Sequence, residues 1–215
     1  MSDYYLIKDK CREGLIRHLE NACRDIPRTG SYRILDIGCG TGVPTFWLAD
    51  NFSGIITAID TDENSLGFLR GKINDKHLQH KVKALHISFF DFISEPCCFD
   101  IILAEGFLNT VDFETGLTRA VEILRTGGYF IIHDEYRDHE KKSEFIQKNN
   151  CQIIETLYLD ETIWWNDYYR QLESGINHAK NAGIRDLFKS DMNEIESYKT
   201  DPSLFRSMYY ILRKF

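Results

Sequence analysis

An aspartate and three alternating glycines within residues 36–42 are the part of this chain best suited to binding a ligand. Asp36 ends a β-branched run, and Gly38, Gly40 and Gly42 occupy the turn that follows. Glycines between a strand and a helix let backbone approach a nucleotide-like ligand closely, and the helix N-terminus favours negative charge. The spacing is GxGxG rather than GxGxxG, which favours a nucleotide-like ligand other than a dinucleotide.

Two more carboxylates follow the next apolar runs of the sequence. Asp60 directly follows the second run, where its two oxygens would accept hydrogen bonds from both hydroxyls of a ribose. Asp62 is an alternative for that role, but its position also predicts the N-cap of a helix. Asp91 follows the third run within an aromatic segment, where it would accept a hydrogen bond from an adenine amine while the N–H of Phe92 meets a ring nitrogen.

Polar residues at the ends of the later apolar runs are candidates for the chemical step. Glu105 and Asn109 follow the fourth run, and His133 ends the fifth. His133 is a candidate general base near neutral pH, and Glu105 would orient an amine or contact the ligand's ammonium group. The alternative for His133 is a strand-end residue hydrogen-bonded to a neighbouring loop. A base is required only if the reacting atom must lose a proton.

Aromatic residues are dense at the start of residues 161–200. Tyr168 shares a helical face with Leu172, a pattern more typical of a core than of a substrate pocket. Trp164 falls beside that face and is a candidate pocket wall for a flat or cationic molecule, and Tyr168 is a second candidate. Tyr5 would close over the same cleft, unless it only docks the N-terminal segment on the sheet.

These residues must be positioned by an alternation of strands and helices. The sequence predicts strands over residues 33–37, 54–59, 82–87, 99–104, 129–134, 151–159 and 207–213. It predicts helices over residues 3–26, 43–51, 114–124 and 138–149, and one that begins after Asp62. Several strands are continuous apolar runs, which indicates a mostly parallel sheet covered on both faces. Residues 161–200 are expected to be a helical excursion packed over the carboxyl edge of that sheet, where open α/β folds bind ligands.

Together these segments resemble the ordered signature of the class I S-adenosylmethionine-dependent methyltransferases, in the small-molecule branch called type 11/25. The resemblance covers about residues 30–160 and rests on residues 36–42, Asp60, Asp91, 99–111 and 123–132. Family members usually have Pro-Gly-Gly where this chain has Thr126, Gly127 and Gly128 in a turn. That departure changes no expected binding residue.

The resemblance implies a Rossmann-like, three-layer α/β/α fold with a seven-stranded sheet whose last strand is antiparallel. It implies one domain over residues 1–215, with a helical cap (1–29), a cofactor-binding core (30–160), a helical insertion or lid (161–200) and the last strand (201–215). S-adenosylmethionine would be the methyl donor and S-adenosylhomocysteine the product. The residues expected to bind the donor are Asp36, Gly38, Cys39, Gly40, Asp60, Thr61, Asp91, Phe92 and Glu105.

Composition narrows the possible partners. The formal net charge is −7, which disfavours a nucleic-acid partner because phosphate binding requires a basic surface. No apolar run is long enough to span a bilayer and no secretory signal is evident, so we expect a cytoplasmic protein without a membrane partner. The six cysteines have no CxxC or metal-type spacing, so no metal site is expected. A monomer and a homodimer both remain open.

The function expected from the sequence is methyl transfer to a small-molecule acceptor, enclosed by the N-terminal segment and residues 161–200. The main alternative is a donor-binding regulatory or scaffold protein that catalyses nothing, because no base is certain. An aminopropyl transferase or a nicotinamide-dependent enzyme is a weaker alternative, and the GxGxG spacing argues against the latter.

Overall fold

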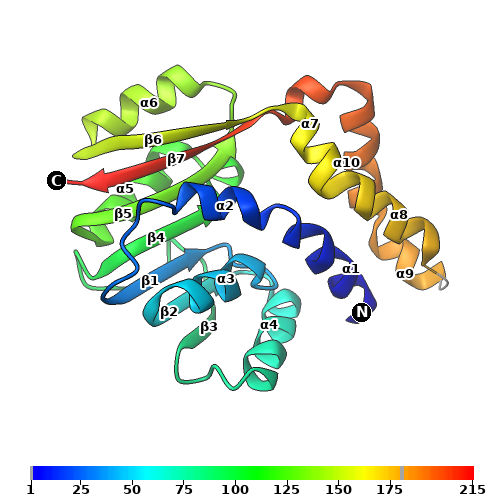
Figure 1. Cartoon of the computed structure of the whole chain (residues 1–215), viewed down its shortest axis with the longest axis horizontal. Helices are drawn as coiled ribbons and strands as arrows, with labels where there is room; N and C mark the ends of the chain where they lie inside the picture. Colours follow the sequence, from blue (N-terminus) through cyan, green and yellow to red (C-terminus); the bar gives the residue numbers. More distant parts are fainter. Residues whose placement is uncertain (1, 180–181) are drawn as a thin grey trace.

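A seven-stranded sheet forms the centre of the protein (Figure 1). The structure is a computed structural model that describes residues 2–179 and 182–215. The strands are β1 (Ser31–Ile37), β2 (Ser53–Asp60), β3 (Val82–His86), β4 (Phe99–Glu105), β5 (Leu124–Glu135), β6 (Cys151–Leu159) and β7 (Ser207–Lys214). Their order across the sheet is β3-β2-β1-β4-β5-β7-β6. The order reverses between β1 and β4, which is where open α/β sheets leave a crevice at the carboxyl ends of their strands.

Strands β1 to β5 pair in parallel, and β7 lies antiparallel between β5 and β6. The predicted antiparallel last strand is therefore confirmed. Strand β5 begins at Leu124, earlier than predicted, because Leu124 already pairs with Phe99 of β4. Gly127, with a φ of +77°, and Gly128 consequently lie inside β5 rather than in a turn before it.

Helices cover both faces of the sheet. The first six are α1 (Ser2–Glu13), α2 (Ile16–Ala22), α3 (Val43–Asn51), α4 (Glu63–Asp75), α5 (Phe113–Ile123) and α6 (His139–Lys148). Residues of α2, α3 and α4 share one core cluster, and residues of α5 and α6 share the other. The prediction of one helix over residues 3–26 is wrong, because the chain breaks between α1 and α2 at Gly14. A Cβ at Gly14 would lie 2.2 Å from the carbonyl oxygen of Asp167, so the backbone passes too close to that segment for a side chain.

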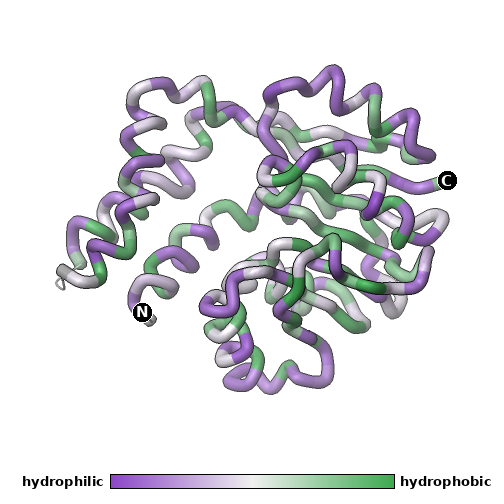
Figure 2. The backbone as a smooth tube through the Cα atoms, turned by 180° about the vertical axis from the view of Figure 1, so that it is seen from behind, coloured by the Kyte–Doolittle hydropathy of each residue, from purple (hydrophilic) through white to green (hydrophobic). Residues whose placement is uncertain are grey.

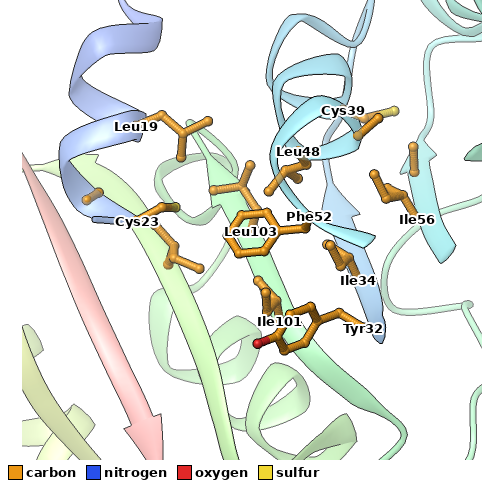
Figure 3. Packing of buried hydrophobic residues seen from close by; sticks show 14 of the residues in the cluster. Leu19, Cys23, Tyr32, Ile34, Cys39, Leu48, Phe52, Ile56, Ile101 and Leu103 are labelled. Carbon is orange, nitrogen blue, oxygen red and sulfur yellow. The ribbon is translucent and has the colours of Figure 1, made fainter. Parts of the chain in front are cut away.

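The two core clusters take alternate residues of the same strands, as the pleat of a sheet requires. Ile34 of β1 and Leu103 of β4 point to the face covered by α3, where they lie near Leu48 and Phe52 (Figure 3). Leu35 points to the opposite face, under α5. Figure 2 shows hydrophobic residues concentrated along the strands.

The chain between β6 and β7 forms a separate group of helices beside the sheet (Figure 1). It contains α7 (Glu161–Trp164), the π-helical turn η2 (Trp165–Tyr169), α8 (Arg170–His178), α9 (Ala182–Leu187), α10 (Lys189–Thr200) and the 3₁₀ turn η3 (Pro202–Phe205). These helices and α1 share a third core cluster that includes Tyr169, Leu172 and Phe188. The predicted helical excursion is confirmed, and α1 connects it to the sheet domain. Within the described residues, no helix combines the length and apolar character needed to cross a bilayer.

Candidate active site

Asp36 fixes the glycine turn to the helix that follows it. Its side chain is buried, and its Oδ2 accepts a hydrogen bond from Thr45 Oγ1 of α3 at 2.5 Å. Burial raises the pKa of Asp36 to about 7, against the lowering effect of the Thr45 hydrogen bond. Asp36 therefore supports the loop from below rather than presenting a free carboxylate at its surface.

The turn after β1 brings bare backbone to the crevice. The N–H of Gly38 donates to Ile59 O at 2.9 Å, which ties the loop to β2. Gly38 has a φ of +71°, and a Cβ there would lie 3.3 Å from Phe107 Cβ. Glycine is needed at this position both for the left-handed backbone and for the close approach.

Asp60 occupies the carboxyl end of β2 and holds two backbone segments in place. Its Oδ2 accepts from Gly40 N at 2.7 Å and its Oδ1 accepts from Asp62 N at 2.8 Å. Each carboxylate oxygen can accept a second hydrogen bond, so Asp60 retains capacity for a ligand. Asp62 caps α4 by accepting from Asn64 N at 3.0 Å, which accounts for its side chain structurally.

A cavity of about 230 Å³ lies over these groups and brings together several of the predicted residues. Gly38, Asp60 and Thr61 line it, together with Phe89 and Phe107. We call it the donor-side cavity. The backbone after β1 and the carboxylate of Asp60 at the end of β2 meet in this cavity. A carboxylate accepts hydrogen bonds, which is what the two hydroxyls of a bound ribose would require.

The residues predicted to contact adenine lie apart from this lining. Asp91 is exposed, and the turn after β3 places Phe89, not Asp91 or Phe92, against the donor-side cavity. The carbonyl of Phe92 accepts from Arg119 Nη2 at 3.0 Å, which holds this end of the segment on α5. The conformation of the turn decides which of its side chains faces the cavity, and the spacing of residues in the sequence does not reveal that conformation.

A second, larger cavity of about 570 Å³ adjoins the first, and we call it the acceptor-side cavity. Gly106 lines both cavities. Its φ is +63°, and a Cβ there would meet no atom within 4 Å, so the residue sits in open space where the two meet. Of the predicted residues, Asn109, His133 and Trp164 line the acceptor-side cavity.

His133 is held in an aromatic stack at the end of β5. Its ring lies 4.3 Å from that of Tyr209 and 5.8 Å from that of Trp164, nearly parallel to both. Its Nε2 lies 2.9 Å from Ser207 Oγ, which also accepts from Trp164 Nε1 at 3.2 Å. Burial, with a smaller contribution from His18, lowers the pKa of His133 to about 3. A ring with so low a pKa is a weak base at neutral pH, so these contacts favour the alternative of a hydrogen-bonded strand-end residue.

Glu105 ends β4 beneath the N-terminal helices. It accepts a short hydrogen bond from the Tyr209 hydroxyl. Burial raises the pKa of Glu105 above its usual value, although Tyr209 and the guanidinium of Arg12 oppose the rise. The group is thus oriented by two neighbours and faces the N-terminal helix rather than the acceptor-side cavity.

The predicted aromatic pocket residues separate into three places. Trp164 lines the acceptor-side cavity and stacks with two protein rings, those of His133 and Tyr169, each at 5.8 Å. Tyr168 is buried and faces Arg12, outside the acceptor-side lining. Tyr5 lines a different cavity, of about 420 Å³, beside Gly40.

Helix α1 contributes two residues that the sequence patterns did not single out. Arg12 Nη1 lies 3.6 Å from where a Cβ of Gly40 would be, and its guanidinium faces Glu105. Asp9 accepts from Thr41 Oγ1 at 2.5 Å and forms an ion pair with Lys72 at 2.6 Å. Charged residues are common on exposed helix faces, so no local signal distinguishes these two from the rest of residues 3–13. Among the described residues, no group of three His, Cys, Asp or Glu side chains is placed to bind a metal ion.

The sequence is similar to those of known methyltransferases. A sequence model described as "Methyltransferase domain" matches residues 28–175. A sarcosine/dimethylglycine N-methyltransferase of Halorhodospira halochloris is 27% identical over 139 residues, which are 64% of this chain and 48% of that protein. This chain spans about half the length, or less, of the first curated relatives that it matches.

Solved structures share the fold at low sequence identity. The [4+2]-cyclase SpnF superposes with a TM-score of 0.79 at 16% identity, covering 92% of this chain and 80% of the other. A putative sarcosine dimethylglycine methyltransferase from Galdieria sulphuraria superposes with a TM-score of 0.76 at 14% identity, covering 94% and 87%. At these identities the likeness concerns the fold alone, and one of the two is described by an activity other than methyl transfer.

Proposed function

Because the chain belongs to the methyltransferase domain family, we propose that it transfers a methyl group from S-adenosylmethionine to a small-molecule acceptor. One observation carries the proposal. The donor-side cavity, lined by Gly38 and Asp60, meets the larger acceptor-side cavity at Gly106. A donor and an acceptor bound in the two cavities would therefore face each other across a residue that has no side chain to separate them.

The donor-side residues fit such a ligand in chemistry. Asp60 accepts from two backbone N–H groups and keeps capacity for ribose hydroxyls, and Gly38 lines the same cavity. Cys39 and Gly40 continue the glycine turn beside it, where the N–H of Gly40 donates to Asp60. Thr61 lines the cavity next to Asp60. We assign the adenine to the side of the cavity that Phe89 closes. Asp91 and Phe92 lie outside that lining, and the N–H of Phe92 already donates to Phe89 O at 3.4 Å, so neither is assigned to the adenine.

The charged groups above the glycine turn fit the amino-acid end of the donor. Arg12 lies over Gly40 and supplies a guanidinium for the carboxylate. Glu105 lies beside Arg12 and supplies a carboxylate for the ammonium group. Asp36 acts through the loop, because its carboxyl is already bonded to Thr45.

The chemical step needs little from the protein's acids and bases. When bound, the donor's sulfonium supplies an electrophilic methyl group, so alignment of the nucleophile and exclusion of water are the main requirements. Burial keeps His133 neutral, and stacking with Tyr209 and Trp164 fixes its ring in the wall of the acceptor-side cavity. His133 therefore shapes the cavity, and the proposal favours acceptors whose nucleophilic atom does not need this ring to remove a proton.

A donor-binding protein without catalysis is the second candidate. The observation that favours it is the state of the two predicted catalytic groups, since His133 has a lowered pKa and Glu105 is bonded to Tyr209. It predicts tight donor binding with no methyl consumption across a broad panel of acceptors, whereas the first candidate predicts S-adenosylhomocysteine release with at least one of them.

Isothermal titration with S-adenosylhomocysteine tests the donor site directly. Asp60→Asn keeps the shape of the side chain but removes one acceptor oxygen, and we expect its Kd to rise about tenfold or more. Asp100→Asn is the matched control, because Asp100 also accepts a backbone N–H, from Arg33 at 2.5 Å, but lies at the start of β4. Absence of binding to the wild type, or equal affinities for wild type and Asp60→Asn, would refute the proposal.

A further inference from the structure

The carboxylates of the acceptor-side cavity all have partners within the protein. Three of them line it, on β5 and α10. The pairs are Asp134 with Lys142 at 2.7 Å, Glu135 with Arg137 at 2.7 Å, and Glu194 with the Tyr169 hydroxyl at 2.6 Å. Their charges are therefore engaged with the protein before any ligand enters.

Arg206 is the contrasting case in the same lining. Its Nε donates to Ser203 O at 3.0 Å, and its guanidinium lies 5.9 Å from the centre of the Tyr136 ring. Its backbone carbonyl also accepts from Tyr136 N at 2.9 Å. Within residues 2–179 and 182–215, no carboxylate forms an ion pair with Arg206. The guanidinium is thus held in place at one edge while its terminal N–H groups remain available.

The rest of the lining is largely aromatic and aliphatic, with Trp164, Phe205 and Leu204 among its members. Leu204 is 67% exposed, so apolar surface continues to the mouth of the cavity beside Arg206. A cavity of this size accommodates a drug-sized molecule. A planar guanidinium with free N–H groups matches a carboxylate in geometry as well as in charge.

Building on the proposed function, we propose that the acceptor is an apolar carboxylate whose anionic end binds Arg206 and whose body reaches toward Gly106. Arg206 determines specificity and does not take part in the chemistry. The acceptor then enters with its charge at the mouth, and its nucleophilic atom lies at the inner end, where the donor-side cavity begins.

The experiment compares four acids with their amides, which have nearly the same shape but no charge. Benzoate, phenylacetate, 3-phenylpropionate and indole-3-acetate are titrated in the presence of saturating S-adenosylhomocysteine. We expect at least one acid to bind about tenfold more tightly than its amide. Arg206→Gln should abolish that preference, and Arg206→Lys should retain part of it.

Arg213→Gln is the matched control. Arg213 lies at the other end of β7, with its guanidinium 5.8 Å from the centre of the Tyr129 ring, so it has the same type of packing far from the cavity. It should keep the full preference for the acid. Amides that bind as well as acids, a preference that survives Arg206→Gln, loss of the preference in Arg213→Gln, or failure of all four acids to bind at millimolar concentration would each overturn the inference.

The same titrations separate this inference from the proposed function. If S-adenosylhomocysteine binds to the wild type and to Arg206→Gln alike, the donor site stands and any failure concerns the acceptor class alone. If S-adenosylhomocysteine does not bind, the proposed function itself fails.

Discussion

Replacing Gly106 with alanine tests whether the two cavities meet where the structure places them. Gly106 lines both, and its N–H donates to His133 O at 3.0 Å, which fixes the backbone at the end of β4. Its φ of +63° is left-handed, and a Cβ would meet no atom within 4 Å. The added methyl group therefore collides with no protein atom, and we expect it to occupy space at the residue that the two cavities share.

The expected magnitudes follow from these two facts. A left-handed backbone costs a residue with a Cβ about 1–2 kcal/mol, with no steric cost added here. In a chain of this length each kcal/mol lowers Tm by about 2–4 °C, so Gly106→Ala should lower it by about 2–8 °C. Forcing a methyl group into a fitted binding site costs about 1–3 kcal/mol, so the Kd for S-adenosylhomocysteine should rise about fivefold or more.

Gly127→Ala separates the backbone effect from the effect on the site. Gly127 has a φ of +77°, also meets no atom within 4 Å, and lies near the start of β5, away from both cavities. Differential scanning fluorimetry should show similar losses of Tm for the two variants. Isothermal titration should show weaker binding of S-adenosylhomocysteine only for Gly106→Ala.

Two results would refute the reasoning. If Gly106→Ala binds S-adenosylhomocysteine as tightly as the wild type, the ligand does not reach Gly106 and the cavities do not form one site. If Gly127→Ala weakens binding equally, the effect of the alanine is a general loss of stability.

Two further predictions concern stability. Burial raises the pKa of Asp36 from 3.8 in the unfolded chain to about 7 in the folded state, so the folded state binds the carboxyl proton more tightly. The stability that the protonated carboxyl contributes is complete below about pH 4 and is lost as the pH rises through about 7. The Tm of the wild type should therefore fall relative to that of Asp36→Asn between about pH 5 and pH 8, and parallel Tm curves would contradict the buried carboxyl. Gly14→Ala would place a Cβ 2.2 Å from Asp167 O and should lower the free energy of unfolding in urea by about 1–3 kcal/mol. Gly71→Ala, exposed in α4 with no atom within 4 Å, should instead raise it by up to about 1 kcal/mol, and equal urea midpoints for the two would count against the close approach at Gly14.

Most strands and core helices could be predicted from the sequence because their signals are local. Helix α3 and strand β6 have the predicted bounds, because a glycine turn precedes the helix and β-branched and aromatic residues fill the strand. The break between α1 and α2 falls at Gly14, where the backbone lies too close to Asp167 for a side chain, and that contact with a distant segment leaves no local signal. The early start of β5 was missed for a similar reason, because pairing with Phe99 overrides the Gly127-Gly128 signal.

The candidate site was predictable to different degrees on its two sides. On the donor side, Gly38 and Asp60 follow or end adjacent parallel strands, and the register of β1 with β2 places both in the lining of one cavity. On the acceptor side, the partners of His133 come from β7 and α7, and no spacing rule predicts that Tyr209 and Trp164 both stack with its ring. The low pKa of His133 follows from that burial, so the sequence could nominate the residue but not its protonation state.

The order of apolar runs, acids and glycines along the chain was enough to predict the α/β architecture, the family and the position of the carboxylate at the end of β2. These features could be predicted because strands, helices and the turns between them depend mainly on contacts between residues close in sequence or in adjacent strands. The tertiary structure decided which side chains share a cavity. Arg12, Tyr209 and Arg206 reach the site from a terminal helix, the last strand and the turn before it, and their positions depend on how distant segments pack. That packing is a sum of many weak contacts spread over the whole chain, and no short stretch of sequence records it.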